Sequence, residues 1–356
     1  MKENWIYRKL EESIEKVKYT TKVQSSDYKG KGLYPIISQE DDMISGYWDN
    51  GSDVFKVNKP VVIFGDHTRT LKYIDFDFVL GADGVKILQP IDKLNAKFFL
   101  YYLKWCKIPS LGYSRHYKLL KEIQIPIPPL PVQERIVSEL DLLSGIIEKK
   151  KEQLKEYEQL AQAIFYDMFG DPVMNEKGWE IKKLEEVSTL INGRAYKQDE
   201  LLDEGKYKVL RVGNFFTNSN YYYSDLELED NKYCDNGDLL FAWSASFGAF
   251  IWNGEKVIYH YHIWKVMFDE EQLNKMFYCY LLNTMTNTFM NDVHGIGMVH
   301  LTKHGMEQYN LPLPPLHLQQ QFAKKIEAIE KQKELIKQSV KETETLFNSR
   351  MDYYFG

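Results

Sequence analysis

Fifty residues in the middle of the chain, 121–170, recur without a gap as residues 307–356. Pro126 corresponds to Pro312, and thirteen of the fifty aligned positions hold the same residue in both copies. Ordered identity at one fixed offset of 186 residues indicates an internal repeat rather than shared composition. A repeated sequence should adopt the same local structure twice, so the chain is predicted to consist of two equivalent halves.

Each copy contains a proline-rich step, IPIPPLP at 125–131 and LPLPPLH at 311–317. Proline fixes φ and has no backbone N–H, so these steps cannot form interior strands, and we expect a stiff, extended lead into the segment that follows. A generic flexible linker is the alternative. Such a linker would not repeat its prolines in register with the pattern that follows them, which favours a rigid joint.

Apolar residues follow each step at alternating intervals of four and three, the heptad pattern of a helix that pairs with another helix. One lysine interrupts each pattern, Lys150 in the first copy and Lys333 in the second. A duplicated unit is most simply arranged about a two-fold axis, so we predict two antiparallel helices, each about 55 Å long, that separate two globular domains. The predicted seam of this pair consists of Ile136, Leu140, Leu143, Ile147, Leu154, Phe322, Ile326, Ile329, Ile336 and Val340.

The regions that precede the two steps share one order of elements, with β-branched and aromatic runs cut by Gly and Asp as in strands and turns. Short helical patterns at 96–106 and 274–290 each lead through a loop to the proline-rich step, and a hairpin turn is expected at 252–255. We therefore predict a mixed α/β fold with pseudo-two-fold duplication. Its parts are a first domain at 1–130, a central helix at 131–170, a second domain at 171–316 and a C-terminal helix at 317–356.

Composition is consistent with two folded domains and with neither a membrane segment nor a metal site. With 356 residues, of which 44% are hydrophobic, the chain can bury a sizeable core and is long enough for two domains. No run of 18 apolar residues occurs, and the start MKENWIYRKLEES lacks the apolar core of a signal peptide, so we expect a cytoplasmic protein. Three widely spaced cysteines without CxxC or CxxH spacing predict ordinary thiols rather than disulfides or a zinc site.

The formal net charge of −6 bears on any nucleic-acid partner. Phosphate contacts from Lys and Arg supply most non-specific affinity for DNA, so an acidic chain is not expected to hold DNA tightly by itself. A role on DNA would need a partner that supplies positive charge. The aromatic content of 14% suits β-rich contact surfaces.

Motifs of the common catalytic sites are absent from the sequence. It contains no GxxxxGK[ST], GxGxxG, HExxH or GxSxG, and no Asn-Pro-Pro-Tyr of the kind that an adenine methyltransferase carries. Acid-x-Lys triplets such as 180–182 arise by chance in a chain with 27% charged residues. We therefore predict a chain without catalytic residues and without a cofactor of its own.

Polar side chains suited to DNA gather instead in loops between the predicted strands. The loop at 64–75 follows an apolar strand, and the loops at 111–118 and 295–305 occupy matching places in the two halves. Arg and Lys can bind guanine or phosphate, Thr a phosphate or a thymine methyl, and Asp a cytosine amino group. A solvated polar hairpin is the alternative for the first loop alone, and the recurrence of the other two weakens that alternative. His260 and His262 could suggest a metal, but no third ligand is evident.

The candidate DNA-binding residues divide between the two halves. Arg69, His67 and Arg115 are assigned to a first half-site, and Ser244, Ser246, His300 and Lys303 to a second. The full candidate set is Ser38, Gln39, Asp66, His67, Thr68, Arg69, Lys72, Arg115, His116, Arg194, Arg211, Asn214, Ser244, Ser246, His262, His300, Thr302 and Lys303.

The tandem halves, the joints IPIPPLPVQERIVSEL and LPLPPLHLQQQFAKKI, and the stretches VVIFGDHTRTLKYIDFDFVLGADGVKIL, GDLLFAWSASFGAFIW and GMVHLTKHGMEQYNLPLPPL together resemble the DNA-specificity (S) subunit of Type I restriction-modification systems. The resemblance covers nearly the whole chain. It implies two target recognition domains separated by antiparallel helices, each domain binding one half of a split, asymmetric site in double-stranded DNA.

The same resemblance implies a non-catalytic subunit of a phage-defence complex. Its partners would be two methyltransferase subunits that modify adenine N6 and restriction/translocase subunits that cut unmodified DNA, and those partners would use S-adenosylmethionine, ATP and Mg. If the methyltransferase subunits close around the duplex, this chain need not be basic. A structural adaptor that binds protein or glycan through two domains on a coiled-coil spacer is the alternative from another class.

Overall fold

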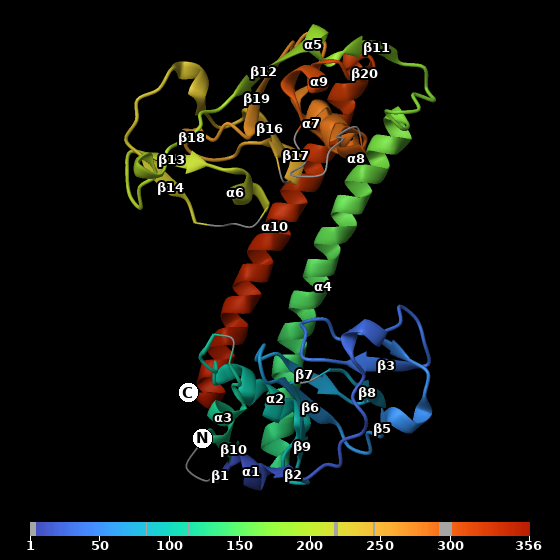
Figure 1. The fold of residues 1–356 in the computed structure, drawn as a ribbon, viewed down its shortest axis with the longest axis vertical. Coiled ribbons are helices and arrows are strands. Elements are labelled where there is room, and N and C mark those ends of the chain that lie inside the picture. Colours follow the sequence, from blue (N-terminus) through green and yellow to red (C-terminus); the bar gives the residue numbers. More distant parts are fainter. Residues whose placement is uncertain (1–4, 83, 113, 217–219, 245, 292–300) are drawn as a thin grey trace. The chain divides into compact units, whose positions relative to one another are not determined.

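The computed structural model describes residues 5–82, 84–112, 114–216, 220–244, 246–291 and 301–356. The chain divides into two compact units: the first unit comprises 1–152 and 337–356, and the second unit comprises 153–336. Each unit contains a globular part and a segment of each of two long helices, α4 (Leu130–Phe169) and α10 (Leu316–Phe355) (Figure 1). Among the described residues, no helix is both long and apolar enough to cross a membrane.

The first unit contains two four-stranded sheets and a two-stranded ribbon. Its elements are β1 (Ile6–Lys9), α1 (Leu10–Ser13), β2 (Ile14–Glu15), η1 (Ser25–Asp27), β3 (Tyr34–Ile37), β4 (Gly46–Trp48), η2 (Gly51–Asp53), β5 (Val54–Phe55), β6 (Val61–Gly65), β7 (Leu71–Ile74), β8 (Phe78–Leu80), β9 (Val85–Pro90), α2 (Ala96–Trp105), α3 (Tyr117–Lys121) and β10 (Gln124–Ile127). The sheets have the strand orders β2-β9-β6-β7 and β4-β3-β8-β5, and β1 and β10 form the antiparallel ribbon. Helix α2 lies against β6, β7 and β9.

The second unit repeats this plan. Its elements are β11 (Glu180–Lys183), α5 (Leu184–Val187), β12 (Ser188–Asn192), η3 (Gln198–Glu200), β13 (Tyr207–Leu210), α6 (Val212–Phe216), β14 (Tyr222–Ser224), η4 (Asp230–Lys232), β15 (Tyr233–Cys234), β16 (Leu239–Ser244), β17 (Ser246–Ile251), β18 (Val257–Tyr259), β19 (Ile263–Phe268), α7 (Lys275–Thr284), α8 (Thr286–Asn291), α9 (Lys303–Glu307) and β20 (Asn310–Leu313). The sheets have the orders β12-β19-β16-β17 and β14-β13-β18-β15, and β11 pairs with β20.

Strand for strand, β1 to β10 correspond to β11 to β20, and the corresponding sheets have the same order. The correspondence includes the parallel pairs β3 with β8 and β13 with β18. The duplication therefore extends from the fifty similar residues to both globular parts. The predicted mixed α/β fold with internal duplication is confirmed, whereas the predicted four-part division by residue ranges stays a prediction.

The prediction of a hairpin turn at 252–255 is wrong. β17 pairs with β16, whereas β18 belongs to the other sheet and pairs with β13 and β15. The Asn-Gly pair is thus a turn between strands of different sheets, because long-range pairing rather than the local turn signal determines the partner of each strand.

Aromatic side chains from α2 and α7 form the centre of each core. In the first unit, Phe98 of α2 is buried and its ring centroid lies 5.4 Å from that of Phe355 in α10. In the second unit, Phe277 of α7 stacks on Phe165 of α4 at 5.9 Å, and Phe165 contacts Phe322 of α10 at 5.7 Å. Residues from both long helices therefore complete the core of each globular part.

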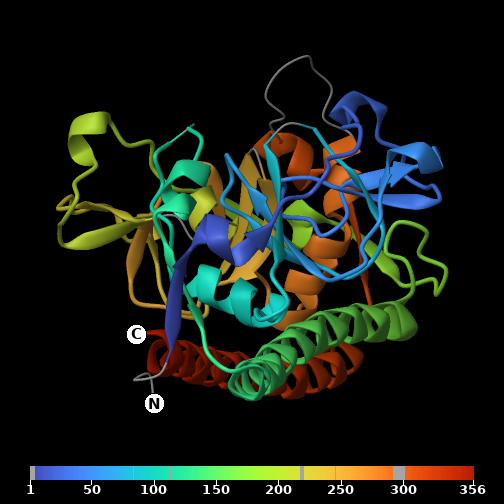
Figure 2. The ribbon, with the colours of Figure 1, turned by 90° about the horizontal axis from the view of Figure 1, so that it is seen from below.

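The two long helices run antiparallel, as predicted, and contacts within each unit establish this. In the first unit, Glu139 of α4 forms an ion pair with Arg350 of α10, and Lys151 lies 2.7 Å from Glu344. In the second unit, Glu158 lies 3.8 Å from Lys333. Low residue numbers of α4 thus meet high residue numbers of α10, and Figure 2 draws the two helices side by side.

The structure buries most of the predicted seam residues. Ile136, Leu140, Leu143, Phe322, Ile326, Ile329 and Val340 are buried, whereas Ile147, Leu154 and Ile336 are half-buried. The interrupting lysines bind polar partners on the other helix: Lys150 Nζ donates to Ser339 Oγ at 2.5 Å, and Lys333 Nζ lies 3.8 Å from Glu158. The buried positions toward the helix ends also pack into the globular cores, which two helices alone could not achieve.

A buried glutamine fixes each proline-rich step to the globular part. Gln133 Oε1 accepts from Asn95 N at 2.8 Å, and Gln133 Nε2 donates to Pro128 O at 2.7 Å and Lys93 O at 2.8 Å. Gln319 repeats this arrangement, with bonds of 2.8, 2.7 and 2.9 Å to Asn274 N, Pro314 O and Gln272 O. Both side chains are fully buried. The start of each long helix is therefore tied to the N-cap of α2 or α7, as a rigid joint requires.

Candidate nucleic-acid interface

Three segments of the first unit meet beside the ends of β3 and β6: the β6–β7 turn, the loop after β3 and the start of α3. Asp66 Oδ1 accepts from Tyr117 N at 2.7 Å, so the β6–β7 turn is tied to α3. Gln39 Oε1 accepts from His67 N at 3.1 Å, and Thr68 Oγ1 donates to Gln39 O at 2.6 Å. The structure therefore brings Gln39, Asp66, His67 and Thr68 together, as neighbouring residues of one site.

His116 is a buried part of this framework. Leu111 N–H donates to His116 Nε2 at 2.9 Å, so Nδ1 carries the hydrogen that is donated to Asp66 O at 3.0 Å. The side chains of His116 and Asp66 are almost completely inaccessible to solvent. Both residues shape the turn and α3, and neither presents its polar atoms to the surface.

Ser38 and Lys72 are also buried supports. Lys72 Nζ donates to Ser38 O at 3.0 Å and to Asp42 O at 2.5 Å, and Ser38 Oγ is 2.6 Å from Ser45 Oγ. Burial of the ammonium lowers the pKa of Lys72, although the neighbouring carboxylates Asp41, Asp42 and Glu40 oppose that shift. Lys72 therefore holds the loop after β3 and does not extend its charge to the surface.

Thr68, Arg69 and Arg115 are the exposed candidates of the first unit. Arg69 has φ of +66°, a left-handed conformation that costs a side chain about 1 kcal/mol or more. Its Nη1 donates to Ile108 O at 3.0 Å. The turn thus presents Arg69 and Thr68, and the segment before α3 presents Arg115, on a framework that Asp66, Gln39 and His116 hold in place.

In the second unit, Arg194 and Arg211 are held by carboxylate and aromatic neighbours. Arg194 forms a two-pronged ion pair with Glu200, at 2.8 and 2.7 Å, and this pairing lowers the pKa of Glu200 to about 2. Arg211 lies over the Tyr222 ring at 4.2 Å, and Asn214 Oδ1 accepts from Arg211 N at 2.8 Å. The planar face of Arg211 is therefore used within the protein, and Asn214 fixes the backbone of the same loop.

The β18–β19 connection forms an aromatic cluster with β16. Trp243 Nε1 donates to Tyr261 O at 3.0 Å, and the Trp243 ring meets the His262 ring edge-on at 5.1 Å. Burial lowers the pKa of His260 to about 4, with His262 and Arg211 adding to that shift, so its imidazole is neutral at pH 7. Trp243 and Tyr261 lie beside the candidate His262 and were not among the predicted residues. The run YHYHIW places aromatic rings at the end of a strand, which is a signal that could have identified Tyr261.

The remaining candidates of the second unit occupy separate positions. Ser244 and Ser246 face each other where β16 and β17 meet, with Ser244 buried and Ser246 half-buried. Thr302 Oγ1 accepts from Gly305 N at 3.1 Å and caps α9, and the exposed Lys303 lies 3.6 Å from Glu307. His300 lies outside the described residues. Within the described ranges, no group of three His, Cys, Asp or Glu side chains is arranged to hold a metal ion.

Comparisons with known proteins match both units. A family model described as the Type I restriction modification DNA specificity domain matches residues 2–156 and 176–345. The Type I restriction enzyme MjaVIII specificity subunit of Methanocaldococcus jannaschii is 23% identical, over 92% of this chain and 86% of its own length. Relatives of this kind are named specificity subunits rather than catalytic subunits, in agreement with the predicted non-catalytic chain.

Solved structures share the fold. The crystal structure of a Type I restriction-modification S subunit from M. genitalium superposes with a TM-score of 0.59 at 14% identity, covering 98% of this chain and 95% of that one. A chain from a structural study of complex assembly and conformational transition of the type I R-M system superposes with a TM-score of 0.56 at 16% identity, covering 99% and 97%.

Proposed function

Because this chain belongs to the Type I restriction-modification DNA specificity family, we propose that its two units each bind one half of a bipartite, asymmetric target in double-stranded DNA. The observation that carries the proposal is the duplication itself. The two units share one strand order but differ in the side chains at corresponding places, such as Thr68 between β6 and β7 and Ser246 at the start of β17. A shared framework with different loops suits two different half-sites.

The exposed or half-buried candidates are the proposed DNA contacts. In the first unit these are Gln39, His67, Thr68, Arg69 and Arg115, and in the second unit Arg194, Arg211, Ser246, His262, Thr302 and Lys303. His300, outside the described residues, is a further proposed contact. Hydroxyl, imidazole and cationic groups can all bind base edges or phosphates. The buried Asp66, His116, Lys72 and Ser38 act through the loops that they hold.

We further propose that α4 and α10 each bind one methyltransferase subunit. Leu160 on α4 and Leu346 on α10 occupy equivalent positions at the offset of 186, and they are 47% and 49% exposed. Glu156 and Glu342 precede them by one helical turn. Two copies of one surface on a duplicated chain suit two copies of one partner.

The partner subunits would carry the chemistry and much of the positive charge. With a net charge of −6, this chain should bind DNA weakly alone and tightly with methyltransferase subunits around the duplex. Adenine methylation with S-adenosylmethionine, and cleavage with ATP and Mg by restriction/translocase subunits, would take place in those partners.

Two measurements test the proposal. Affinity for target DNA at fixed salt should rise from weak to nanomolar when the methyltransferase is added. Nanomolar binding by the lone chain would contradict the proposal that the partner subunits supply much of the positive charge. If the chain were an adaptor for protein or glycan, adding the methyltransferase would not raise its affinity for the target DNA.

An exchange of residues 179–310 for the corresponding region of a relative tests the separate half-sites. Mapping of methylated adenines should show a change in one half-site only. A change in both would show that the two units do not bind independently.

A further inference from the structure

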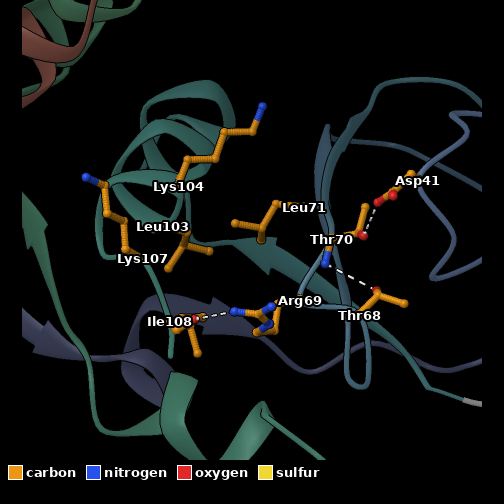
Figure 3. Close-up of a pocket in the computed structure, with 9 residues that line it drawn as sticks. All are labelled: Asp41, Thr68, Arg69, Thr70, Leu71, Leu103, Lys104, Lys107 and Ile108. Carbon is orange, nitrogen blue, oxygen red and sulfur yellow. Dashed lines mark hydrogen bonds between the residues drawn. The ribbon is translucent and has the colours of Figure 1, made fainter. Parts of the chain in front are cut away.

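A pocket of about 350 Å³ lies in the first unit between the β6–β7 turn and the C-terminal end of α2 (Figure 3). Leu71 and Leu103 supply apolar surface, and the neighbouring Thr68 and Thr70 supply hydroxyl groups. Figure 3 shows Arg69 extending from the turn toward Ile108, whereas Lys104 and Lys107 lie on the opposite side with their amino groups pointing away from Arg69. The pocket therefore combines apolar, hydroxyl and cationic groups.

The lining carries a net positive charge in an acidic chain. Arg69, Lys104 and Lys107 are its cations, and Asp41 is the one carboxylate among the described residues that line it. Asp41 Oδ1 accepts a hydrogen bond from Thr70 Oγ1 at 2.9 Å. Within the described ranges, neither Lys104 nor Lys107 forms an ion pair. The local balance of three cations and one acid contrasts with the net charge of −6 for the chain.

Backbone strain is concentrated at the same pocket. Of the three described non-glycine residues with positive φ, two line it: Arg69 at +66° and Lys107 at +44°. Such conformations cost about 1–3 kcal/mol each and are often found at binding sites. The bond from Arg69 Nη1 to Ile108 O orients the guanidinium, which has five N–H groups and so retains donors for a ligand.

We propose that this pocket binds a phosphodiester group of the DNA backbone. Arg69 would bind its oxygens, the exposed side chains of Lys104 and Lys107 would rotate toward them, and Leu71 and Leu103 would contact the adjacent sugar. The assignment rests on the proposed DNA-binding function and, of the two ligands expected for an arginine of this loop, guanine and phosphate, selects phosphate. A guanidinium already tied to the backbone beside two lysines suits a phosphate, which positions the duplex without distinguishing its bases.

The second unit uses the equivalent place differently. When α2 and α7 are aligned on their N-caps, Asn95 and Asn274, Lys104 corresponds to Asn283. Asn283 Oδ1 accepts from Ala249 N at 2.8 Å, and its Nδ2 donates to Ala249 O at 2.9 Å. The amide thus binds the backbone of β17. The cationic pocket is therefore an addition to the first unit and not a requirement of the shared fold.

Salt dependence of DNA binding tests the proposal. The variants Lys104→Gln, Lys107→Gln and Arg69→Gln would be prepared in the full chain, alone and with its methyltransferase, and titrated with target duplex at several salt concentrations. Each variant should make the negative slope of log Kobs against log salt shallower by about 0.9. Each should also weaken binding about fivefold to tenfold at about 0.1 M salt, equally for every DNA sequence. Lys93→Gln is the matched control, because exposed Lys93 precedes the opposite end of the same helix.

A neutral methylphosphonate placed at one linkage at a time identifies the ligand. Substitution at one particular linkage should weaken DNA binding by the wild type but should cause no further loss for Lys104→Gln. Inorganic phosphate alone should not saturate the pocket at millimolar concentration. The proposal would be overturned if Lys104→Gln and Lys107→Gln left the salt slope unchanged and every methylphosphonate substitution weakened these variants as much as the wild type. This outcome can be read even if Arg69→Gln fails to fold. A loss confined to one base pair would return Arg69 to base recognition. Failure of the wild-type complex to bind DNA would instead overturn the proposed function.

Discussion

Replacement of Gln133 with leucine should destabilise the first unit by about 3 kcal/mol or more. The side chain is fully buried and makes three hydrogen bonds of 2.7 to 2.8 Å, to Asn95 N, Lys93 O and Pro128 O. Leucine has a similar size but can form none of them. Each such bond contributes about 1 kcal/mol net, and each buried partner left without one costs about 1–3 kcal/mol.

Hydrogen exchange under native conditions, followed by peptide, measures this loss for each unit separately. Gln319→Leu should cost the second unit about as much, because its three bonds match those of Gln133. Gln338→Leu is the control, since Gln338 is exposed on α10 and should cost about 0.5 kcal/mol or less. A loss below about 1 kcal/mol, or a loss in only one of the two joint variants, would refute the reasoning.

Three other perturbations have expected outcomes. Leu143→Asp or Ile329→Asp places a charge at a buried seam position and should cost several kcal/mol, lowering the melting temperature and abolishing partner assembly, so normal melting would contradict the seam. Four residues inserted after Glu152 add about 6 Å of helix and should lengthen the gap between unchanged half-sites by about one or two base pairs, as methylome sequencing would show. Burial lowers the pKa of His260 from 6.5 to about 4, so the unfolded state binds a proton that the folded state lacks. The second unit should therefore lose stability as the pH falls from about 6.5 to about 4, as urea unfolding at a series of pH values would measure. His260→Phe should remove this pH dependence.

The long-range plan of the chain could be predicted because repeated sequence and heptad spacing are both visible without knowledge of contacts. The antiparallel pairing of α4 and α10 follows from the duplication and from the apolar seam. Strand partners were less predictable. The Asn-Gly pair at 253–254 has the local chemistry of a hairpin, but β18 pairs with β13, which lies far away in sequence.

The roles of polar residues were the least predictable part of the site. Thr68 and Lys72 follow the same strand and have equally suitable side chains, yet Thr68 is exposed and Lys72 is buried. Burial depends on which loop covers a residue, and here the loop after β3 supplies the carbonyls that accept from Lys72. The identity of Gln133 and Gln319 was visible in the repeat, but two of the three hydrogen-bond partners of each, Asn95 and Lys93 or Asn274 and Gln272, lie outside the repeated fifty residues.

The fidelity of the repeat differs between parts of the chain for a physical reason. The joints and long helices would meet the same partner twice, so one set of contacts serves both copies, and the buried glutamines keep the same three partners. The loops would meet different bases, so they can differ without loss to the framework.

A phosphate pocket in the first unit alone would also affect how the DNA is oriented on the chain. Because the two units share one framework, each unit could bind either half-site, and a contact present in one unit alone favours one orientation of the duplex over the other. Charge concentrated at Arg69, Lys104 and Lys107 would thus help to orient the DNA, although the chain as a whole is acidic.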